Sequence, residues 1–297
     1  MPHIRIRLGY YLTCGTDYAV AAEGPKEIFR IVLELSDNVP EKADLLDKCG
    51  DGFARNFFGN THKKEDINKA ILAYESAFHL TPHGYLDSTG SRLNKLGALL
   101  YHRFNLVGDL TDISKAILYQ QKVICLTPED DANMPSWLNN LGLSYQRRFE
   151  HTGDLADISD AVSYLLKALH CTPEGHANMP SQLDNLGISL RSRFECTGDL
   201  ADISDAISYK QKAVHLTPEG HAEMPNLLYS LGISIKSHFE HTGDLADISD
   251  AISHKQKAVH LTPEGHAKMP SWLNNLGISF QSRFEHTRDH EIGRAHV

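Results

Sequence analysis

Histidine is the residue type in this chain with the most evident potential for chemistry, since eighteen occur among 297 residues. Imidazole binds transition metals and transfers protons near neutral pH. Nine histidines form three sets that advance in steps of 45 residues: His151, His241 and His286; His170, His215 and His260; His176, His221 and His266. One step corresponds to about 10 Å between packed helices, whereas metal ligands lie within about 2–2.6 Å of the ion. We predict helix-end or solvated histidines, no metal site and, at most, a pH-dependent stability.

Cysteine and aspartate offer two further kinds of chemistry. Cys171 follows His170, and Cys196 occupies the place of His151 and His241 in its own repeat, but residues adjacent in sequence seldom have the geometry of a nucleophile and its base. Asp199, Asp202 and Asp205 are close in sequence; we interpret the first two as helix-capping and dipole-compensating residues and the third as solvated. The chain has neither a phosphate-binding Gly-rich loop nor a Gly-x-Ser-x-Gly turn. We expect no catalytic residue, no cofactor and no enzyme activity.

A row of cations recurs before a phenylalanine at the same step of 45 residues: Arg103, Arg148, Arg193, His238 and Arg283. Guanidinium groups in a row can recognise the acidic groups of a peptide. The alternative, which we favour, is that they pair within the fold, for instance with Asp154 or Asp199.

Composition narrows the classes of partner. A formal net charge of −9 without a Lys/Arg cluster argues against nucleic acid and against an anionic membrane surface. The longest apolar runs are too short to span a bilayer, and the N-terminal run meets Asp17 too early for a signal peptide. Five cysteines without a Cys-x-x-Cys pair indicate reduced thiols. We expect a cytoplasmic protein with a protein or peptide partner.

An internal repeat of 45 residues determines which elements position these side chains. The repeats that begin at Pro180 and Pro225 match at 35 of 45 positions. Three short motifs recur with this period. A Leu-Gly pair occurs at 96–97, 141–142, 186–187, 231–232 and 276–277, and Gly-Asp-Leu occurs at 108–110, 153–155, 198–200 and 243–245. Thr-Pro occurs at 127–128, 172–173, 217–218 and 262–263, and an earlier Thr-Pro at 81–82 is one residue out of step.

Each repeat contains two segments with helical periodicity. The first begins at a proline such as Pro180, which suits the first helical position, and ends near Gly198, which can adopt the left-handed cap. The second begins at Asp199 as N-cap and ends at Pro218. Lys210 and Lys212 lie toward its negative end, the favourable side of the helix dipole. We predict an all-α protein in which antiparallel helix pairs stack, since neither helix can bury its apolar face alone.

The repeats resemble the tetratricopeptide (TPR) family. Its first helix carries a large residue, then Leu-Gly, then an aromatic, as in Leu138, Leu141-Gly142 and Tyr145. Its second helix carries two alanines and a proline: Ala161, Ala168 and Pro173; Ala206, Ala213 and Pro218; Ala251, Ala258 and Pro263. The resemblance covers residues 40–287 and implies an α-solenoid with a right-handed superhelix.

The repeat departs from the family in its length. The family's usual repeat has about 34 residues, and this one has 45. The longer repeat resembles fungal TPR arrays that accompany CHAT domains or signalling NTPases. A HEAT or armadillo array, whose period also fits, is the competing fold.

The predicted organisation runs as follows. An N-terminal segment, 1–39, can include the second helix of an earlier repeat, and a divergent repeat at 40–86 places Gly50, Ala70 and Pro82 at pattern positions around an irregular join at 60–65. The remaining repeats are 87–134, 135–179, 180–224, 225–269 and a partial one, 270–287.

Residues 288–297 break the pattern, with Arg288 in place of the expected glycine. Residues 291–297 can be encoded as GAG ATC GGA AGA GCA CAC GTC, which resembles a sequencing-library adapter. We interpret 288–297 as a non-native tail, and we expect the last helix to fray and the chain to aggregate through an uncovered face.

The resemblance also indicates where a partner binds, because in the family the first helices line a concave groove. Seven of the ten differences between the two most similar repeats fall in the first helix, as expected for varied contacts on a fixed frame. We predict an adaptor that holds a peptide there; the alternative is a regulatory array of a larger enzyme, such as a CHAT-type protease or signalling NTPase. The expected partner-binding residues are Asn94, Tyr101, Asn139, Gln146, Asp184, Arg191, Tyr229, Lys236, Asn274 and Gln281.

Overall fold

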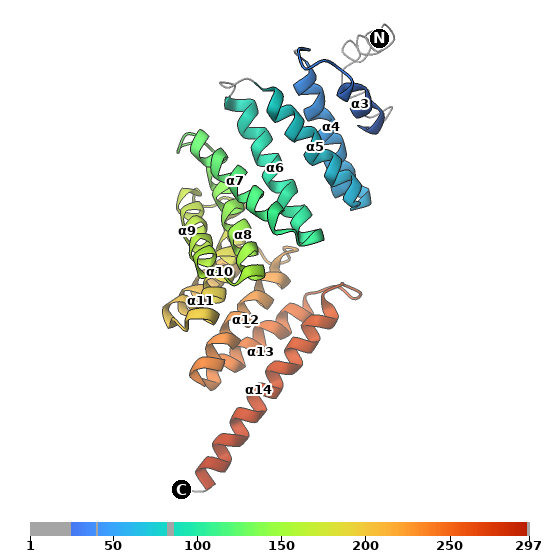
Figure 1. Cartoon of the computed structure of the whole chain (residues 1–297). Coiled ribbons are helices and arrows are strands. Elements are labelled where there is room, and N and C mark those ends of the chain that lie inside the picture. The colour runs from blue at the N-terminus through green and yellow to red at the C-terminus, as the bar shows by residue number, and fades with distance from the viewer. Residues whose placement is uncertain (1–24, 40, 82–85, 296–297) are drawn as a thin grey trace. The chain divides into compact units, whose positions relative to one another are not determined.

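The chain forms helices and connecting turns throughout the residues that the structure describes. The computed structural model describes residues 25–39, 41–81 and 86–295 (Figure 1). The expectations for residues 1–24 and for Pro82 therefore lie outside the described residues. The chain divides into two compact units, Met1–Arg148 and Phe149–Val297, and each is treated by itself.

The first unit is a run of helices, and each helix between residues 25 and 126 packs on the next along the chain. Its helices are α3 (Pro25–Leu33), α4 (Lys42–Asn56), α5 (Lys64–Leu80), α6 (Leu86–Val107), α7 (Leu110–Leu126) and the first part of α8 (Met134–Thr152). The predicted irregular join is a π-helical turn, η1 (Phe57–Thr61), after which His62 adopts a left-handed backbone with φ of 45°.

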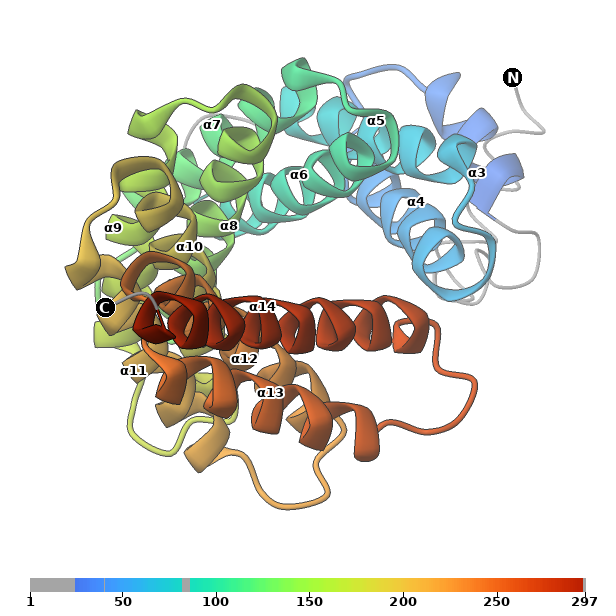
Figure 2. The same ribbon diagram turned by 90° about the horizontal axis from the view of Figure 1, so that it is seen from below.

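In the second unit, each helix from residue 155 onward packs on the next along the chain. This unit holds the end of α8, then α9 (Leu155–Cys171), α10 (Met179–Thr197), α11 (Leu200–Leu216), α12 (Met224–Thr242), α13 (Leu245–His260) and α14 (Met269–Ala295). The closest packing joins α10 to α11 and α12 to α13, and α14 lies against α13 (Figure 2). The predicted all-α architecture of stacked helix pairs is confirmed, and the superhelix hand stays a prediction.

Local signals in the sequence place the helix ends. Gly198 ends α10 with φ of 73°, a left-handed conformation that favours glycine. Its N–H donates to Phe194 O at 2.7 Å. The Asp199 carboxylate then accepts a hydrogen bond of 3.0 Å from Ala201 N, as the N-cap of α11. A turn of two residues therefore reverses the chain, and α11 packs antiparallel to α10.

Close approach of the paired helices depends on small residues. Ala206 of α11 is fully buried beside Leu186 of α10. A Cβ placed on Gly187 would lie 2.7 Å from Lys210 Cγ, so only glycine fits there. We call this place the glycine notch. Gly50, Gly97 and Gly232 make the same notch in their own repeats, where Tyr74, Gln120 and Lys255 fill it.

Helix α14 differs from α10 and α12 at its C-terminal end. Those helices stop at Thr197 and Thr242, each followed by a left-handed glycine. Arg288 occupies the glycine's place after Thr287, and α14 continues to Ala295. A residue with a Cβ resists the left-handed conformation, and arginine is a good helix former. The substitution therefore extends this helix.

Candidate protein-interaction surface

Three of the five cations in the row on the first helices pair with a carboxylate of the following helix. Arg193 forms two hydrogen bonds with the Asp202 carboxylate, at 2.7 and 2.5 Å. Arg103 does the same with Asp112, and His238 Nδ1 lies 2.6 Å from Asp247 Oδ2. For these three side chains, pairing within the fold was the favoured interpretation.

Asp199, one of the two acids given as examples of partners for the cations, does not pair with Arg193. Its carboxylate is used by the N-cap, and Asp202, one helical turn later, turns back toward α10. Asp202 thus has a pairing role beyond compensation of the helix dipole. The pairing raises the pKa of Arg193.

Two lysines lie buried beneath the first helices. Lys210 is 1% exposed; its ammonium donates to Ser230 Oγ at 2.6 Å and lies 3.7 Å from Asp184 Oδ1. Lys255 is also buried and donates to Ser279 Oγ at 2.8 Å. Burial lowers the pKa of both lysines to about 8, opposed at Lys210 by Asp184. Lys210 lies toward the C-terminal end of α11, as the sequence indicates, but its side chain crosses to the next repeat.

The predicted partner-binding residues differ in exposure. Gln146 is buried, which corrects the expectation that it is exposed. Asn274 and Gln281 are exposed, and seven are half-buried: Asn94, Tyr101, Asn139, Asp184, Arg191, Tyr229 and Lys236. Their role in binding stays a prediction.

Six of these residues belong to the second unit, and we call them the first-helix surface: Asp184 and Arg191 of α10, Tyr229 and Lys236 of α12, and Asn274 and Gln281 of α14. Helices α10 and α12 are in contact. The Tyr229 ring stacks on Trp272 of α14 with centroids 4.7 Å apart, and its hydroxyl accepts from Asn275 Nδ2 at 2.5 Å. The three helices therefore form one continuous surface, and Tyr229 serves as a joint between repeats.

The two cations of this surface pair along their own helix. Arg191 pairs with Glu195 and Lys236 with Glu240, four residues on. Gln281 Nε2 donates to Glu285 Oε1 at 2.8 Å, the same spacing. Exposed pairs of this kind contribute about 0.3–0.5 kcal/mol. A ligand carboxylate or amide can therefore displace the intrahelical partner at little cost.

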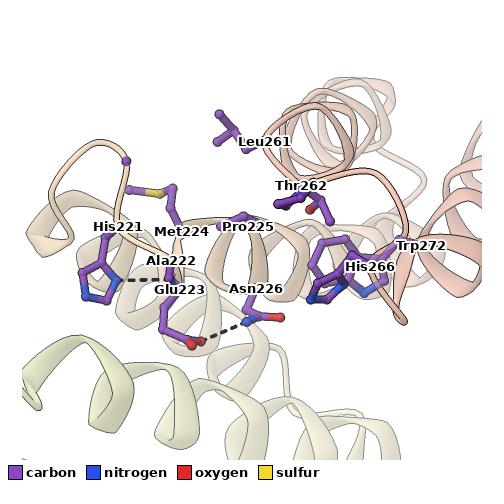
Figure 3. A pocket seen from close by; sticks show the side chains of 12 residues that line it. His221, Ala222, Glu223, Met224, Pro225, Asn226, Leu261, Thr262, His266 and Trp272 are labelled. Atoms are coloured by element: carbon purple, nitrogen blue, oxygen red, sulfur yellow. Dashed lines mark hydrogen bonds between the residues drawn. The ribbon is translucent and has the colours of Figure 1, made fainter.

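A cavity lies at the edge of the second unit where one repeat is joined to the next. It has a volume of about 470 Å³ and is lined by residues 220–226, by residues 261–263 just after α13, and by His266 and Trp272 (Figure 3). An equivalent cavity of about 350 Å³ occurs one repeat earlier. Both combine apolar walls with histidine and glutamate, and sequence reasoning did not find them because their walls come from separate segments.

The link histidines have a structural role at these cavities. His221 Nδ1 accepts a hydrogen bond of 3.2 Å from Glu223 N, and Asn226 donates to the Glu223 carboxylate (Figure 3). His176 and His266 accept in the same way from the backbone two residues on. His241 and His286 instead pack edge-on against the Phe194 and Phe239 rings.

Other kinds of site find no support within the described part of the chain. No three His, Cys, Asp or Glu side chains there lie close enough to hold a metal ion. Cys171 and Cys196 are exposed and unbridged. None of the helices that the structure describes combines the length and apolar character needed to cross a bilayer.

The fold is that of a TPR-like stack of helix pairs. A scan of protein-family models gives no match, and a search of curated proteins gives none either. Among solved structures, BtubC (BKLC) from P. vanneervenii is similar with a TM-score of 0.55 and 16% identity, over 80% of this chain and 88% of that one. A Podosopora anserina protein with nearly identical TPR-like repeats has a TM-score of 0.52 and 9% identity, over 74% and 98%. These likenesses show the fold alone.

Proposed function

We propose that this chain is a non-catalytic protein-interaction scaffold of the cytoplasm that binds a peptide across the first-helix surface. The observation that carries the proposal is the contrast between a fixed frame and a varied surface. Glycine notches, alanines and capping aspartates repeat almost unchanged, whereas the place of Asp184 holds Tyr229 and Asn274 in the following repeats. A surface that changes from one repeat to the next supports sequence-specific recognition.

Electrostatics supports a peptide with acidic or amide groups. Arg191 and Lys236 present cations on neighbouring helices. Each is held by a weak intrahelical pair that a ligand can replace. A net charge of −9 on the whole chain restricts this preference to the local surface. The role as a regulatory array of a CHAT-type protease or signalling NTPase stays a prediction, because no residue of the described structure distinguishes it.

The test is selection of binding peptides from a random library displayed on phage, with the full chain as target. We expect selected peptides to lose affinity roughly tenfold or more on Arg191→Glu or Lys236→Glu. Lys212→Glu on the exposed side of α11 is the matched control and should bind normally. Peptides that bind all three variants equally would show that the first-helix surface is not the binding site.

A further inference from the structure

Helix α14 presents the face that α10 and α12 cover with a second helix. On α12 this face includes Leu228 and Phe239, which pack against Ala258 and Ile248 of α13. The corresponding residues of α14 are Leu273, Leu276, Gly277, Arg283 and Phe284, and we call them the acceptor face.

Exposure shows that the apolar part of the acceptor face is uncovered. Leu273 is 50% exposed, whereas its counterpart Leu228 is 2% exposed. Phe284 is 62% exposed, against 4% for Phe239. Leu276 packs on the preceding repeat and is only partly buried. Two large apolar side chains on one helix face therefore contact solvent where their equivalents form the core.

The glycine notch of α14 is also empty. A Cβ placed on Gly277 would meet no atom within 4 Å, whereas Gly187 and Gly232 are filled by lysine side chains that would lie 2.7 and 2.9 Å away. Glycine inside a helix is unfavourable relative to alanine. A glycine at this place therefore fits a helix that approaches α14 as closely as α11 approaches α10 and α13 approaches α12.

Arg283, the cation of the acceptor face, differs from its counterparts in the two preceding repeats. Arg193 and His238 pair with Asp202 and Asp247, in the first turn of the second helix. The Arg283 guanidinium instead lies over the Phe280 ring, 5.3 Å from its centroid. Among the residues that the structure describes, no carboxylate pairs with it. Arg283 is thus placed to receive an aspartate from an incoming helix.

We propose that the acceptor face of α14 binds an amphipathic helix with the pattern of α11 and α13. Numbered from the first helical residue, both α11 and α13 have Asp at position 3, Ile at 4, Ala at 7 and 14, and Lys at 11. The aspartate pairs with Arg283, the alanines permit close approach, and position 11 enters the Gly277 notch. This surface is separate from the first-helix surface, so the inference goes beyond the proposed function.

A second copy of α14 fits the acceptor face less well than such a helix. Two copies related by a twofold axis would bring a second arginine, and no aspartate, to this face. They would also oppose Leu273 and Leu276 with large side chains where their counterparts on α12 meet Ala258 and Ala251. Charge and side-chain size therefore both favour a partner with the alanine pattern.

The experiment uses the full chain and a fluorescein-labelled peptide with the sequence of residues 244–260, which is Asp244 followed by α13. Fluorescence anisotropy should show saturable binding. Gly277→Leu, which closes the notch, and Arg283→Glu, which repels Asp247 of the peptide, should each weaken binding roughly tenfold or more. A peptide carrying Asp247→Arg should recover affinity for the Arg283→Glu chain only. Lys212→Glu, on the exposed side of α11, makes the same change of charge away from α14 and is the matched control, which should leave binding unchanged.

The combination of the Arg283→Glu chain with the Asp247→Arg peptide distinguishes the proposed binding from misfolding of the variant and from displacement of α13. A variant that fails to fold cannot be rescued by a changed peptide, and a peptide that displaces α13 from α12 would not respond to Arg283. Absence of saturable binding would overturn the proposal. So would sedimentation data showing a dimer that Phe284→Glu dissociates, because the face would then belong to a second copy.

Discussion

Lys210 and Lys255 are unusual because their side chains are buried, whereas lysine side chains ordinarily lie at the surface. Lys210 and Lys255 occupy a core position, and each carries its ammonium to a serine of the next repeat. A buried cation of this kind is expensive unless hydrogen-bonded. Replacement of such groups by apolar residues of similar size is often neutral or stabilising. Their effect on stability should therefore be visible through pH.

We predict that the free energy of unfolding rises between about pH 8 and pH 10.5. Folding lowers the pKa of both lysines from 10.5 to about 8, so the unfolded chain binds more protons in this window. The rise should be on the order of 1 kcal/mol per pH unit for each lysine. Below pH 8 both states are protonated and the penalty is constant.

Urea unfolding of the natural chain and of the Lys210→Met/Lys255→Met double variant at pH 8 and pH 10 checks this prediction. The lysine-dependent rise should vanish in the variant, because methionine does not titrate. An equal rise in both proteins would assign the alkaline effect to other groups.

At the scale of the element, one glycine position offers an internally controlled comparison. Gly187→Ala should destabilise the chain by about 1–3 kcal/mol, since the new Cβ meets Lys210 at 2.7 Å. Gly277→Ala should stabilise it by about 0.5–1 kcal/mol, because its notch is empty and alanine is the better helix former. Thermal unfolding monitored by circular dichroism measures both. Opposite signs are expected, and the same sign for both would contradict the notch.

The end of α14 provides a second prediction at this scale. Arg288→Gly should stop the helix at Thr287, as Gly198 and Gly243 stop α10 and α12. Amide hydrogen exchange at residues 289–295 should then become faster. Arg288→Ala is the control and should keep the helix, because alanine favours it. Unchanged protection after Arg288→Gly would mean that other contacts hold this segment.

At the scale of the whole molecule, charge and the acceptor face together govern solubility. The net charge of −9 at pH 7 falls to zero near pH 6, because the sequence has an isoelectric point of about 6.0. Low net charge combined with exposed apolar side chains promotes association. We predict a solubility minimum near pH 6, measured as turbidity. Leu273→Glu/Phe284→Glu should reduce the turbidity, and an unchanged minimum would place the association elsewhere.

The sequence alone determined the repeat, the all-α class and the helix ends, because these follow from local chemistry. Gly198 and Asp199 specify a cap and a start whatever the neighbouring repeats do. The repeated alanines, and the glycine of each Leu-Gly pair, likewise indicate that the paired helices pack closely. The resemblance to the TPR family rested on these same residues.

Only the tertiary structure decided what each side chain meets across the helix pair. In the sequence, Asp199 and Asp202 are equivalent candidates to pair with Arg193. In the structure, the Asp199 carboxylate accepts the N-cap hydrogen bond, and Asp202 pairs with Arg193. Lys210 resembles a solvated lysine in sequence, yet the Gly187 notch directs it through the core. Tyr229 was expected on an open surface and stacks on Trp272. Periodicity fixes which residues share a helix face, but the neighbour that covers this face depends on the placement of helices far along the chain.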